Sequence, residues 1–483
     1  GKTYVVRDYF DVFDEVYCPK EHTFEFLQNV LTEVMELFPS HYIHIGGDEC
    51  PKKAWKKCAH CQHLMKWEGL PNEEALQSWF IHRIEQFVNS KGRDIIGWDE
   101  ILEGGLAPNA TVMSWRGEKG GIEAAHQRHK VIMTPGKKCY LDYYQESPEF
   151  APLAIGGFLP LDTVYNYDPL PAELTPEEQA YIIGVQANIW GEYIQTPEYF
   201  EYMAFPRLLA MSEVQWTQPE HKDFESFARR LDKEFERLDY CGVNACRNFY
   251  EVNQAGAWNK AQQTYEVTLN TFCPDADIYY AVNDSTVNTS SSLYKTPIPL
   301  DEDATVYSAV YRDGKPLGKV TRKSFAVNKA TGCDYTCNPE AGWEHLNKGF
   351  GLTDGRRGYA RDMRRWISFY QDTVQIVVEL KKPQKVKEVA FSSLWRPVNE
   401  IWPARAMSVS VSMDGQTFIP VGTKQLTYDF TLTEGTRFPA SLSFAETEAA
   451  FVRLELLSGG LCPKGYFHEG LQSELAIDEI EIY

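Results

Sequence analysis

The first half of the chain alternates between helical and strand-like spacing of apolar residues. One helical pattern precedes residue 42, where the apolar side chains are Phe24, Leu27, Leu31, Val34 and Phe38. Residues spaced in this way share one face of a helix, so the pattern predicts an amphipathic helix laid on a sheet. Helical patterns follow at about residues 73–90 and 199–213.

Short apolar runs lie between these helical patterns. They occupy residues 42–45, 94–97, 110–113, 130–133 and 182–185. Such runs are typical of strands buried in a parallel sheet. Repeated strand-then-helix units predict an α/β fold in which a parallel sheet is covered by helices and closes as a (β/α)8 TIM barrel.

The pattern changes after about residue 246. Over residues 253–332, short alternating segments separated by Asn-Asp-Ser and Asp-Gly turns predict a small antiparallel β-sandwich. Further alternating strands follow from about residue 340 to 483. We therefore expect a barrel portion over 1–246, a small β-sandwich over 253–332 and a second β-domain over 340–483.

Composition narrows the class of partner. The net charge of −20 argues against nucleic acid and against anionic membrane surfaces, because both bind basic patches. No apolar run approaches the ~18 residues of a membrane span. Aromatic residues make up 13% of the chain and include 12 Trp, which suits stacking on sugar rings, although many of these rings will be core.

Two adjacent carboxylates follow the first predicted strand. The run 42–45 leads into Gly46 and Gly47 and then into Asp48 and Glu49. Strand alternation would place His44, Gly46 and Asp48 on one face, and the glycines would leave room for a ligand or a neighbouring backbone. Two acids this close should hold different protonation states, one ionised and one able to donate a proton. The alternative is a strand followed by an acidic turn.

The motif His-Ile-Gly-Gly-Asp-Glu at 44–49 resembles the signature of the β-N-acetylhexosaminidases, family 20 of the glycoside hydrolases. The motifs that follow in that family's order are Gly-Trp-Asp-Glu at 97–100, Ser-Trp at 114–115, Tyr-Leu-Asp at 140–142 and Trp-Gly-Glu at 190–192. The resemblance covers roughly residues 8–246. Residues 253–332 resemble the carboxy-terminal β-domain of chitobiases, and residues 340–483 resemble a discoidin-type jelly roll of the coagulation-factor type C class.

The resemblance implies a retaining exo-β-N-acetylhexosaminidase that removes terminal β-linked N-acetylglucosamine or N-acetylgalactosamine without cofactor or metal. Glu49 would be the general acid. Asp48 would orient the substrate's 2-acetamido group, whose oxygen attacks the anomeric carbon in the substrate-assisted variant of the reaction. An extracytoplasmic location also follows from the family.

The resemblance further implies a sugar pocket. Trp98, Trp115 and Trp190 would form its walls and platform, Tyr140 would hold the acetamide oxygen, and Asp142 and Glu192 would accept hydrogen bonds from the 4- and 6-hydroxyls of the terminal sugar. Two other acids in these motifs, Asp99 and Glu100, are expected to support or cap the site. We expect His44 to be a buried, hydrogen-bonded strand residue.

The chain departs from the family at the start of the barrel. The strand at residue 42 resembles the fourth of eight, so we expect the first three strands, with an arginine and a histidine of the site, to come from another segment. The alternative is that this chain folds differently. Two rival functions are a carbohydrate-binding remnant in which the jelly roll does the binding, and a lacto-N-biosidase with a wider pocket near Glu192.

Two further features have no assigned role. Eleven cysteines include Cys50, Cys58 and Cys61, which with His63 have the spacing of zinc ligands, but a local disulfide or reduced thiols is the preferred interpretation. The loops of the last domain carry Trp343, Trp395 and Trp402. We expect these rings to pack against the neighbouring domain rather than to bind glycan.

Overall fold

The computed structural model describes residues 12–339, 351–432, 435–466 and 469–483. Its contacts divide the chain into two compact units. Unit 1 comprises residues 1–145, 157–224 and 243–245, and unit 2 comprises residues 146–156, 225–242 and 246–483. Within the described ranges, no helix combines the length and the apolar character needed to cross a membrane. The domain boundaries expected near residues 246 and 340 stay predictions.

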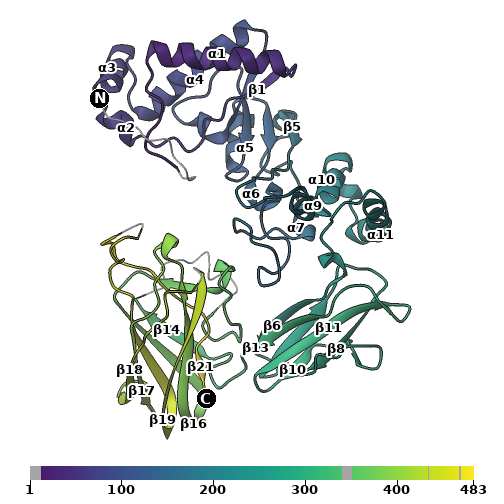
Figure 1. The fold of residues 1–483 in the computed structure, drawn as a ribbon, viewed down its shortest axis with the longest axis vertical. Coiled ribbons are helices and arrows are strands. Elements are labelled where there is room, and N and C mark those ends of the chain that lie inside the picture. The colour runs from purple at the N-terminus through teal and green to yellow at the C-terminus, as the bar shows by residue number, and fades with distance from the viewer. Residues whose placement is uncertain (1–11, 340–350, 433–434, 467–468) are drawn as a thin grey trace. The chain divides into compact units, whose positions relative to one another are not determined.

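A five-stranded parallel sheet forms the centre of unit 1 (Figure 1). Its strands lie in chain order as β1 (Tyr42–His44), β2 (Asp94–Trp98), β3 (Thr111–Ser114), β4 (Val131–Met133) and β5 (Ile182–Val185). All four pairings are parallel. The five strands predicted from short apolar runs are therefore confirmed, whereas the eight-stranded closed barrel stays a prediction.

Helices cover this sheet as the spacing of apolar residues predicts. Helix α4 (Glu73–Ser90) packs on β2 and on α1 (Glu21–Leu37), and α5 (Lys119–His126) packs on β3 and β4. The start of α4 is capped by Asn72, whose side chain accepts a hydrogen bond from the Ala75 N–H. The remaining helices of unit 1 are α2 (Lys53–Lys57), α3 (Ala59–Glu68), η1 (Asp99–Leu102), α6 (Gly136–Cys139), α7 (Leu161–Tyr165), α8 (Pro176–Gln179), α9 (Pro197–Ala204), α10 (Arg207–Trp216) and η2 (Pro219–His221).

The helical pattern predicted at about residues 199–213 is confirmed, but it is divided between two helices. The structure has two helices there, α9 and α10, with Pro206 between them. Proline has no N–H to donate and its ring clashes with the preceding turn, so a continuous helix is not possible at this residue. Apolar spacing continues across the break, so the pattern alone does not mark it.

Unit 2 contains most of α11 (Phe224–Tyr240), then η3 (Asn248–Tyr250) and two small antiparallel sheets (Figure 1). The first contains β10 (Ile298–Leu300), β7 (Thr264–Asn270) and β6 (Asn253–Asn259). The second contains β12 (Lys315–Pro316), β11 (Ala304–Arg312), β8 (Asp277–Val282), β9 (Ser292–Leu293) and β13 (Thr321–Phe325). The alternating segments predicted in this region are therefore antiparallel strands.

A larger antiparallel sheet completes unit 2. Its eight strands are β14 (Asp334–Asn338), β15 (Ile367–Phe369), β16 (Thr373–Trp395), β17 (Ala406–Ser412), β18 (Ile419–Gln425), β19 (Thr436–Leu457), β20 (Leu475–Ile477) and β21 (Glu481–Ile482). Two short turns, η4 (Met363–Arg365) and η5 (Pro397–Asn399), lie in the connections. The long strands β16 and β19 pair along most of their length, with two register shifts. One apolar core joins residues from most of these strands. The jelly-roll topology stays a prediction.

The tryptophans of this larger sheet are core residues. Trp395 and Trp402 are buried together with Phe438 and Cys462, and Tyr428 packs against them. Both rings are buried as expected, but their neighbours belong to the same sheet region, so a neighbouring domain is not what buries them. Trp343 lies outside the described residues.

Candidate active site

The segment after β1 departs from strand geometry at its two glycines. Gly46 and Gly47 have φ values of +74° and +97°, in the left-handed region that favours glycine. A Cβ on Gly47 would lie 2.5 Å from Cγ2 of Ile101. The space beside Gly47 is therefore filled by a side chain of η1 rather than by a ligand. The predicted alternation of His44, Gly46 and Asp48 on one face is wrong, because β1 ends at His44.

The two carboxylates after the glycines have different surroundings. Asp48 is half-buried, and burial raises the pKa of its carboxyl. The Glu100 carboxylate adds to this rise. Glu49 is exposed and has a φ of +45°, an uncommon conformation for a residue with a side chain. Strain of this kind, of order 1 kcal/mol or more, often occurs at functional sites.

Four aromatic residues predicted for the pocket lie together. Trp98 ends β2, Trp115 follows β3, and Tyr140 and Trp190 lie beyond β4 and β5. The ring centroids of Trp98 lie 5.9 Å from Trp190 and 6.5 Å from Trp115. Those of Tyr140 lie 6.3 Å from Trp115 and 6.2 Å from Trp190. The four rings thus form a closed circuit at the carboxyl ends of parallel strands, where barrel enzymes have their active sites.

The circuit of four rings is open to solvent on one side. Trp190 is 40% exposed, whereas Tyr140 is buried. His44 lies next to this circuit, with its ring centroid 4.8 Å from that of Trp98. Contrary to expectation, His44 is exposed rather than buried, although it is hydrogen-bonded: Gly46 N–H donates to its Nδ1 at 3.1 Å.

The backbone around Tyr140 is held by a parallel bridge to Asn188. Leu141 N–H donates to the Asn188 carbonyl at 2.7 Å, and Asn188 N–H donates to the Cys139 carbonyl at 2.9 Å. Burial raises the pKa of Tyr140 despite the opposing effect of the Asn188 side chain. The Tyr140 hydroxyl therefore keeps its proton at neutral pH and can donate a hydrogen bond. Sequence reasoning missed Asn188. The signal for it was the polar, apolar, polar alternation Gln186, Ala187, Asn188 directly after β5.

Asp142 is a buried acid with unfilled hydrogen-bonding capacity. It is 4% exposed, and neither carboxylate oxygen accepts a hydrogen bond of good geometry from a described residue. Burial raises its pKa to about 6, and the nearby Glu192 carboxylate adds to the rise, while Arg207 and the Trp190 backbone N–H oppose it. Glu192 itself is exposed. Buried polar atoms without partners are rare in folded proteins, so this carboxylate is a candidate ligand-binding group.

Arg207 supports the loop that carries Asp142. Its side chain is fully buried at the start of α10. The guanidinium donates to backbone carbonyls of four residues, which are Leu141, Tyr143, Leu159 and Met203. A buried cation bonded in this way fixes several chain segments at once. Sequence reasoning missed Arg207, because it belongs to no recognised motif.

Asp99 and Glu100, the first two residues of η1, bond to Trp115 and to its neighbour Arg116. Trp115 donates through its indole N–H to Glu100 Oε2 at 2.9 Å. Arg116 Nε donates to Asp99 Oδ1 at 3.1 Å, and its distance to Glu100 Oε2 is 3.8 Å. Burial raises the pKa of Asp99 to about 7, with Glu100 adding to the rise and Arg116 opposing it. These contacts agree with the supporting position expected for both acids.

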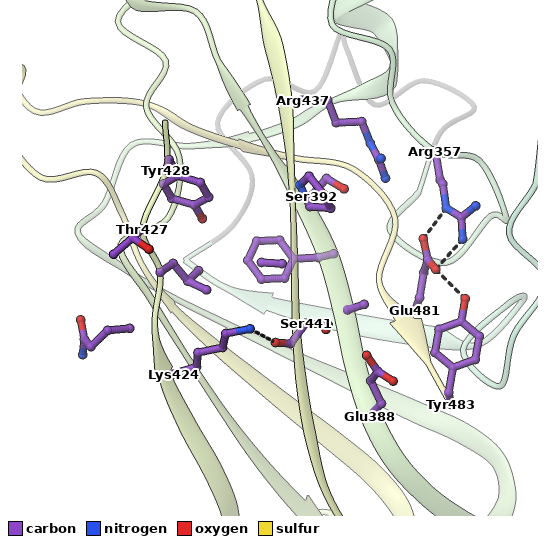
Figure 2. Close-up of a pocket in the computed structure, with 16 residues that line it drawn as sticks. Arg357, Glu388, Ser392, Lys424, Thr427, Tyr428, Arg437, Ser441, Glu481 and Tyr483 are labelled. Carbon is purple, nitrogen blue, oxygen red and sulfur yellow. Dashed lines mark hydrogen bonds and ion pairs between the residues drawn. The ribbon is translucent and has the colours of Figure 1, made fainter. Parts of the chain in front are cut away.

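A cavity of about 690 Å³ in unit 2 contains none of the predicted site residues (Figure 2). Three of its charged side chains, those of Arg357, Glu481 and Lys424, bond to other lining residues. Arg357 Nε donates to Glu481 Oε1 at 2.6 Å, and the Tyr483 hydroxyl donates to Glu481 Oε2 at 2.6 Å. Lys424 donates to the Ser441 carbonyl at 2.8 Å. Groups satisfied in this way have less capacity for a ligand than Asp142 has.

The predicted metal group is only partly brought together. Cys58 and Cys61 lie close to each other, and the third member of the cluster is Cys18 rather than Cys50 or His63. No disulfide joins the cysteines that the structure describes. Sequence reasoning missed Cys18 because it lies 40 residues before Cys58.

Comparisons with known proteins agree with these features. Residues 2–219 match the model of the glycosyl hydrolase family 20 catalytic domain, and residues 253–321 match that of the chitobiase/beta-hexosaminidase C-terminal domain. Residues 2–219 are therefore similar to the catalytic domain of that family. The resemblance of residues 340–483 to a discoidin-type domain stays a prediction.

Several curated relatives are beta-hexosaminidases. The protein from Porphyromonas gingivalis is 54% identical over 235 residues, which are 48% of this chain and 30% of that protein. The protein from Vibrio furnissii is 37% identical over 195 residues, which are 39% of this chain and 32% of that protein. A solved GH20 exo β-N-acetylglucosaminidase from Vibrio harveyi, in complex with N-acetylglucosamine, is 35% identical with a TM-score of 0.43, covering 47% of this chain and 36% of that one. The chain thus spans about a third of the length of these relatives.

Proposed function

We propose that this chain contributes the catalytic residues of a retaining exo-β-N-acetylhexosaminidase that releases terminal β-linked N-acetylglucosamine or N-acetylgalactosamine. The observation that carries the proposal is the circuit of Trp98, Trp115, Tyr140 and Trp190 at the strand ends. A circuit of flat rings that is partly open offers apolar surface to the C–H groups of a sugar. The unsatisfied Asp142 adds an acceptor for its hydroxyls.

The first chemical step would use the substrate's own acetamide. The acetamido oxygen attacks the anomeric carbon, the glycosidic C–O bond breaks, and an oxazolinium ion forms. The raised pKa of Asp48 reflects a carboxyl in partly desolvated surroundings, where its charge acts strongly on a nearby cation. Asp48 would accept the acetamide N–H and balance the positive charge, and the protonated Tyr140 would donate to the acetamide oxygen.

Glu49 would move the proton in both steps. It protonates the glycosidic oxygen as the leaving group departs, and the resulting carboxylate then takes a proton from water. That water attacks the anomeric carbon from the side that the leaving group vacated, so the configuration is retained. A positioned acid–base group of this kind contributes roughly 10²- to 10⁴-fold to the rate.

Two acids would select the terminal sugar. Asp142 would accept hydrogen bonds from the 4- and 6-hydroxyls, together with Glu192, which is close enough to raise the pKa of Asp142. A carboxylate that closes one end of the pocket leaves no room for another sugar beyond it. This arrangement favours release of one residue from the non-reducing end.

We further infer that other strands complete the site. Both β1 and β5 are edges of the described sheet, and Ile183 on β5 is exposed. Parallel sheets are normally covered and their edges paired, so such edges favour additional strands beside them. Those strands would supply the arginine that grips sugar hydroxyls and the histidine that assists the acid. By its family we also infer an extracytoplasmic location.

The test uses Glu49→Gln in the chain alone and in the chain joined to the preceding strands of a family 20 domain. The matched control is Glu123→Gln, an exposed glutamate of α5. We expect the Glu49 variant to lose roughly 10²- to 10⁴-fold in kcat on N-acetylglucosaminides with poor leaving groups and much less on activated aryl glycosides. Equal losses on both substrates would contradict the assignment.

The same preparations separate the rival functions. Release of an intact disaccharide would indicate a lacto-N-biosidase. Saturable glycan binding without turnover by the completed domain would indicate a carbohydrate-binding remnant. Turnover of plain glucosides at the rate of N-acetylglucosaminides would rule out participation of the acetamide.

A further inference from the structure

Three thiols from two separate segments of unit 1 converge on one point. Cys18 Sγ lies 3.8 Å from Cys61 Sγ and 4.0 Å from Cys58 Sγ. All three sulfur atoms lie within 4.8 Å of one another. A disulfide has an S–S length of about 2.05 Å, so these contacts are not disulfides. Three mutually adjacent thiols also cannot all pair, because a disulfide uses two.

The spacing of the sulfur atoms matches a metal-centred tetrahedron. Zinc binds thiolates at about 2.3 Å with tetrahedral angles, which places neighbouring sulfur atoms about 3.8 Å apart. We propose that Cys18, Cys58 and Cys61 bind a structural zinc ion. The proposal concerns the fold and does not depend on the function proposed above.

The backbone around Cys58 and Cys61 suits bound thiolates. Cys58 immediately precedes α3 and Cys61 lies in its first turn, where unpaired N–H groups favour negative charge.

Specific contacts bring Cys18 to this turn from the segment before α1. The Trp55 indole N–H donates to the Tyr17 carbonyl at 3.0 Å. On the other side of Cys18, His60 Nε2 donates to the Pro19 carbonyl at 3.2 Å. The residues flanking Cys18 are thus each hydrogen-bonded to the region of Cys58 and Cys61. These two hydrogen bonds hold Cys18 beside Cys58 and Cys61. A free thiol that only packs in an apolar cluster does not need its neighbours to be held in this way.

The apolar surroundings agree with a closed structural site. Trp55, Met65 and Leu76 form a buried cluster with Cys61, and Cys18, Cys58 and Cys50 pack against it. Structural zinc sites almost always have four ligands. Cys50 is the candidate for the fourth position, because it is the remaining thiol of this cluster, although its sulfur lies outside the group of three.

Zinc at this position would stabilise the loop that follows Asp48 and Glu49. Cys50 comes next in the chain, and its carbonyl accepts a hydrogen bond from Lys52 Nζ at 2.8 Å. Lys52 also bonds to Gln77, whose Nε2 donates to the Gly47 carbonyl at 2.8 Å. The metal, this hydrogen-bond chain and α4 would therefore hold the same loop from two sides.

The first experiment measures metal in the 483-residue chain purified without chelator or added metal. We expect about one zinc per chain, and X-ray absorption should give Zn–S distances of about 2.3 Å. Replacing zinc with Co²⁺ should produce thiolate-to-cobalt charge-transfer bands. Iron or copper in place of zinc, or a disulfide between any two of the three cysteines in metal-free protein, would overturn the proposal.

Variants then test the ligands one by one. Cys18→Ser and Cys61→Ser should each lose most of the bound zinc, while the exposed Cys241→Ser should retain it. Cys50→Ser shows whether the fourth zinc ligand is the Cys50 thiolate or a water molecule. X-ray absorption should show one sulfur fewer around the zinc only if Cys50 is a ligand. Where a variant is insoluble, release of zinc from the native chain by a thiol-blocking mercurial gives the same answer. Zinc retained after three thiols are blocked would contradict thiolate ligation.

Discussion

A buried carboxylate lies in each compact unit, and the two differ in how they are satisfied. Asp142 in unit 1 is 4% exposed and its oxygens lack well-formed hydrogen bonds to described residues. Asp478 in unit 2 is 3% exposed but accepts from Gly358 N–H, Ser392 N–H and Arg437 Nε, at 3.0, 2.8 and 2.9 Å. Burial raises the pKa of both. Burial alone therefore does not identify a carboxylate as part of a binding site. The distinguishing feature is a carboxylate oxygen that still has the capacity to accept a hydrogen bond.

The tryptophans of the two units repeat this difference. Trp190 is 40% exposed beside three other aromatic rings, while Trp402 is 6% exposed inside an aromatic cluster. Both belong to aromatic clusters, but only the first offers a ring face to a ligand. Substitutions at matched positions should therefore separate binding from stability.

The largest effect is expected for Asp48→Asn compared with Asp478→Ala. Asp48→Asn should lower kcat on N-acetyl substrates by roughly 10²- to 10³-fold, because the oxazolinium loses its balancing charge, and leave unfolding unchanged. Asp478→Ala leaves two buried N–H groups and Arg437 without a partner, so the free energy of unfolding should fall by about 3 kcal/mol. For both variants, denaturant titration measures the free energy of unfolding and steady-state kinetics measures kcat. A kinetic defect in the Asp478 variant at a temperature where it is folded would break the comparison.

The next effect is expected for Trp402→Ala compared with Trp190→Ala. Removing the buried Trp402 ring should reduce the free energy of unfolding by about 3 kcal/mol. Removing the exposed Trp190 ring should change stability little and lower kcat/KM about tenfold through lost stacking on the sugar. Thermal unfolding with kinetics tests the pair, and a Trp190 variant as unstable as the Trp402 variant would assign Trp190 to the core.

The smallest effect is a pH dependence traced to Asp142. Its carboxyl must be ionised to accept hydrogen bonds from sugar hydroxyls, and its pKa is about 6. The value of kcat/KM should therefore fall about tenfold per pH unit below pH 6. Asp142→Asn should weaken substrate binding and remove this acidic limb, whereas the exposed Asp168→Asn should keep it.

The same pKa gives the sign of a stability effect. It lies above the ordinary value of an aspartate, so the fold favours the protonated form. The stabilisation from Asp142 is full below about pH 4 and is lost as the pH rises through about 6. The free energy of unfolding of the native chain and of Asp142→Asn can be compared between about pH 4 and pH 6. If Asp142 makes the native chain more stable as the pH rises through this interval, the raised pKa is contradicted.

The elements that the sequence predicts best are those set by local apolar spacing. The five parallel strands, α1 and α4 follow from runs of a few residues, because their side chains face one core. The break between α9 and α10 at Pro206 lies inside the helical pattern at 199–213, and β1 ends at His44, so strand alternation does not extend through Gly46 to Asp48.

In the candidate site, too, residues that belong to local motifs were predicted and residues that depend on distant contacts were not. Trp98, Trp115, Tyr140 and Trp190 were found because each belongs to a recognisable motif at a strand end. Arg207 and Cys18 were not found, because their partners are distant in the chain and a single arginine or cysteine carries no spacing signal. Contacts that depend on the folded path of the chain cannot be read from local periodicity.

The packing of Ile101 against Gly97 limits the order in which substitutions at residues 97 and 101 can accumulate. A Cβ on Gly97 would lie 2.7 Å from Ile101 Cγ2 and 2.9 Å from its Cδ1. Gly97 has no positive φ, so its obstacle to a side chain is this isoleucine together with the nearby Gly46 carbonyl. Along an evolutionary path, a smaller residue at 101 must therefore arise before a larger one at 97. Gly47 has no such path, because its φ of +97° disfavours any side chain even when the space is cleared.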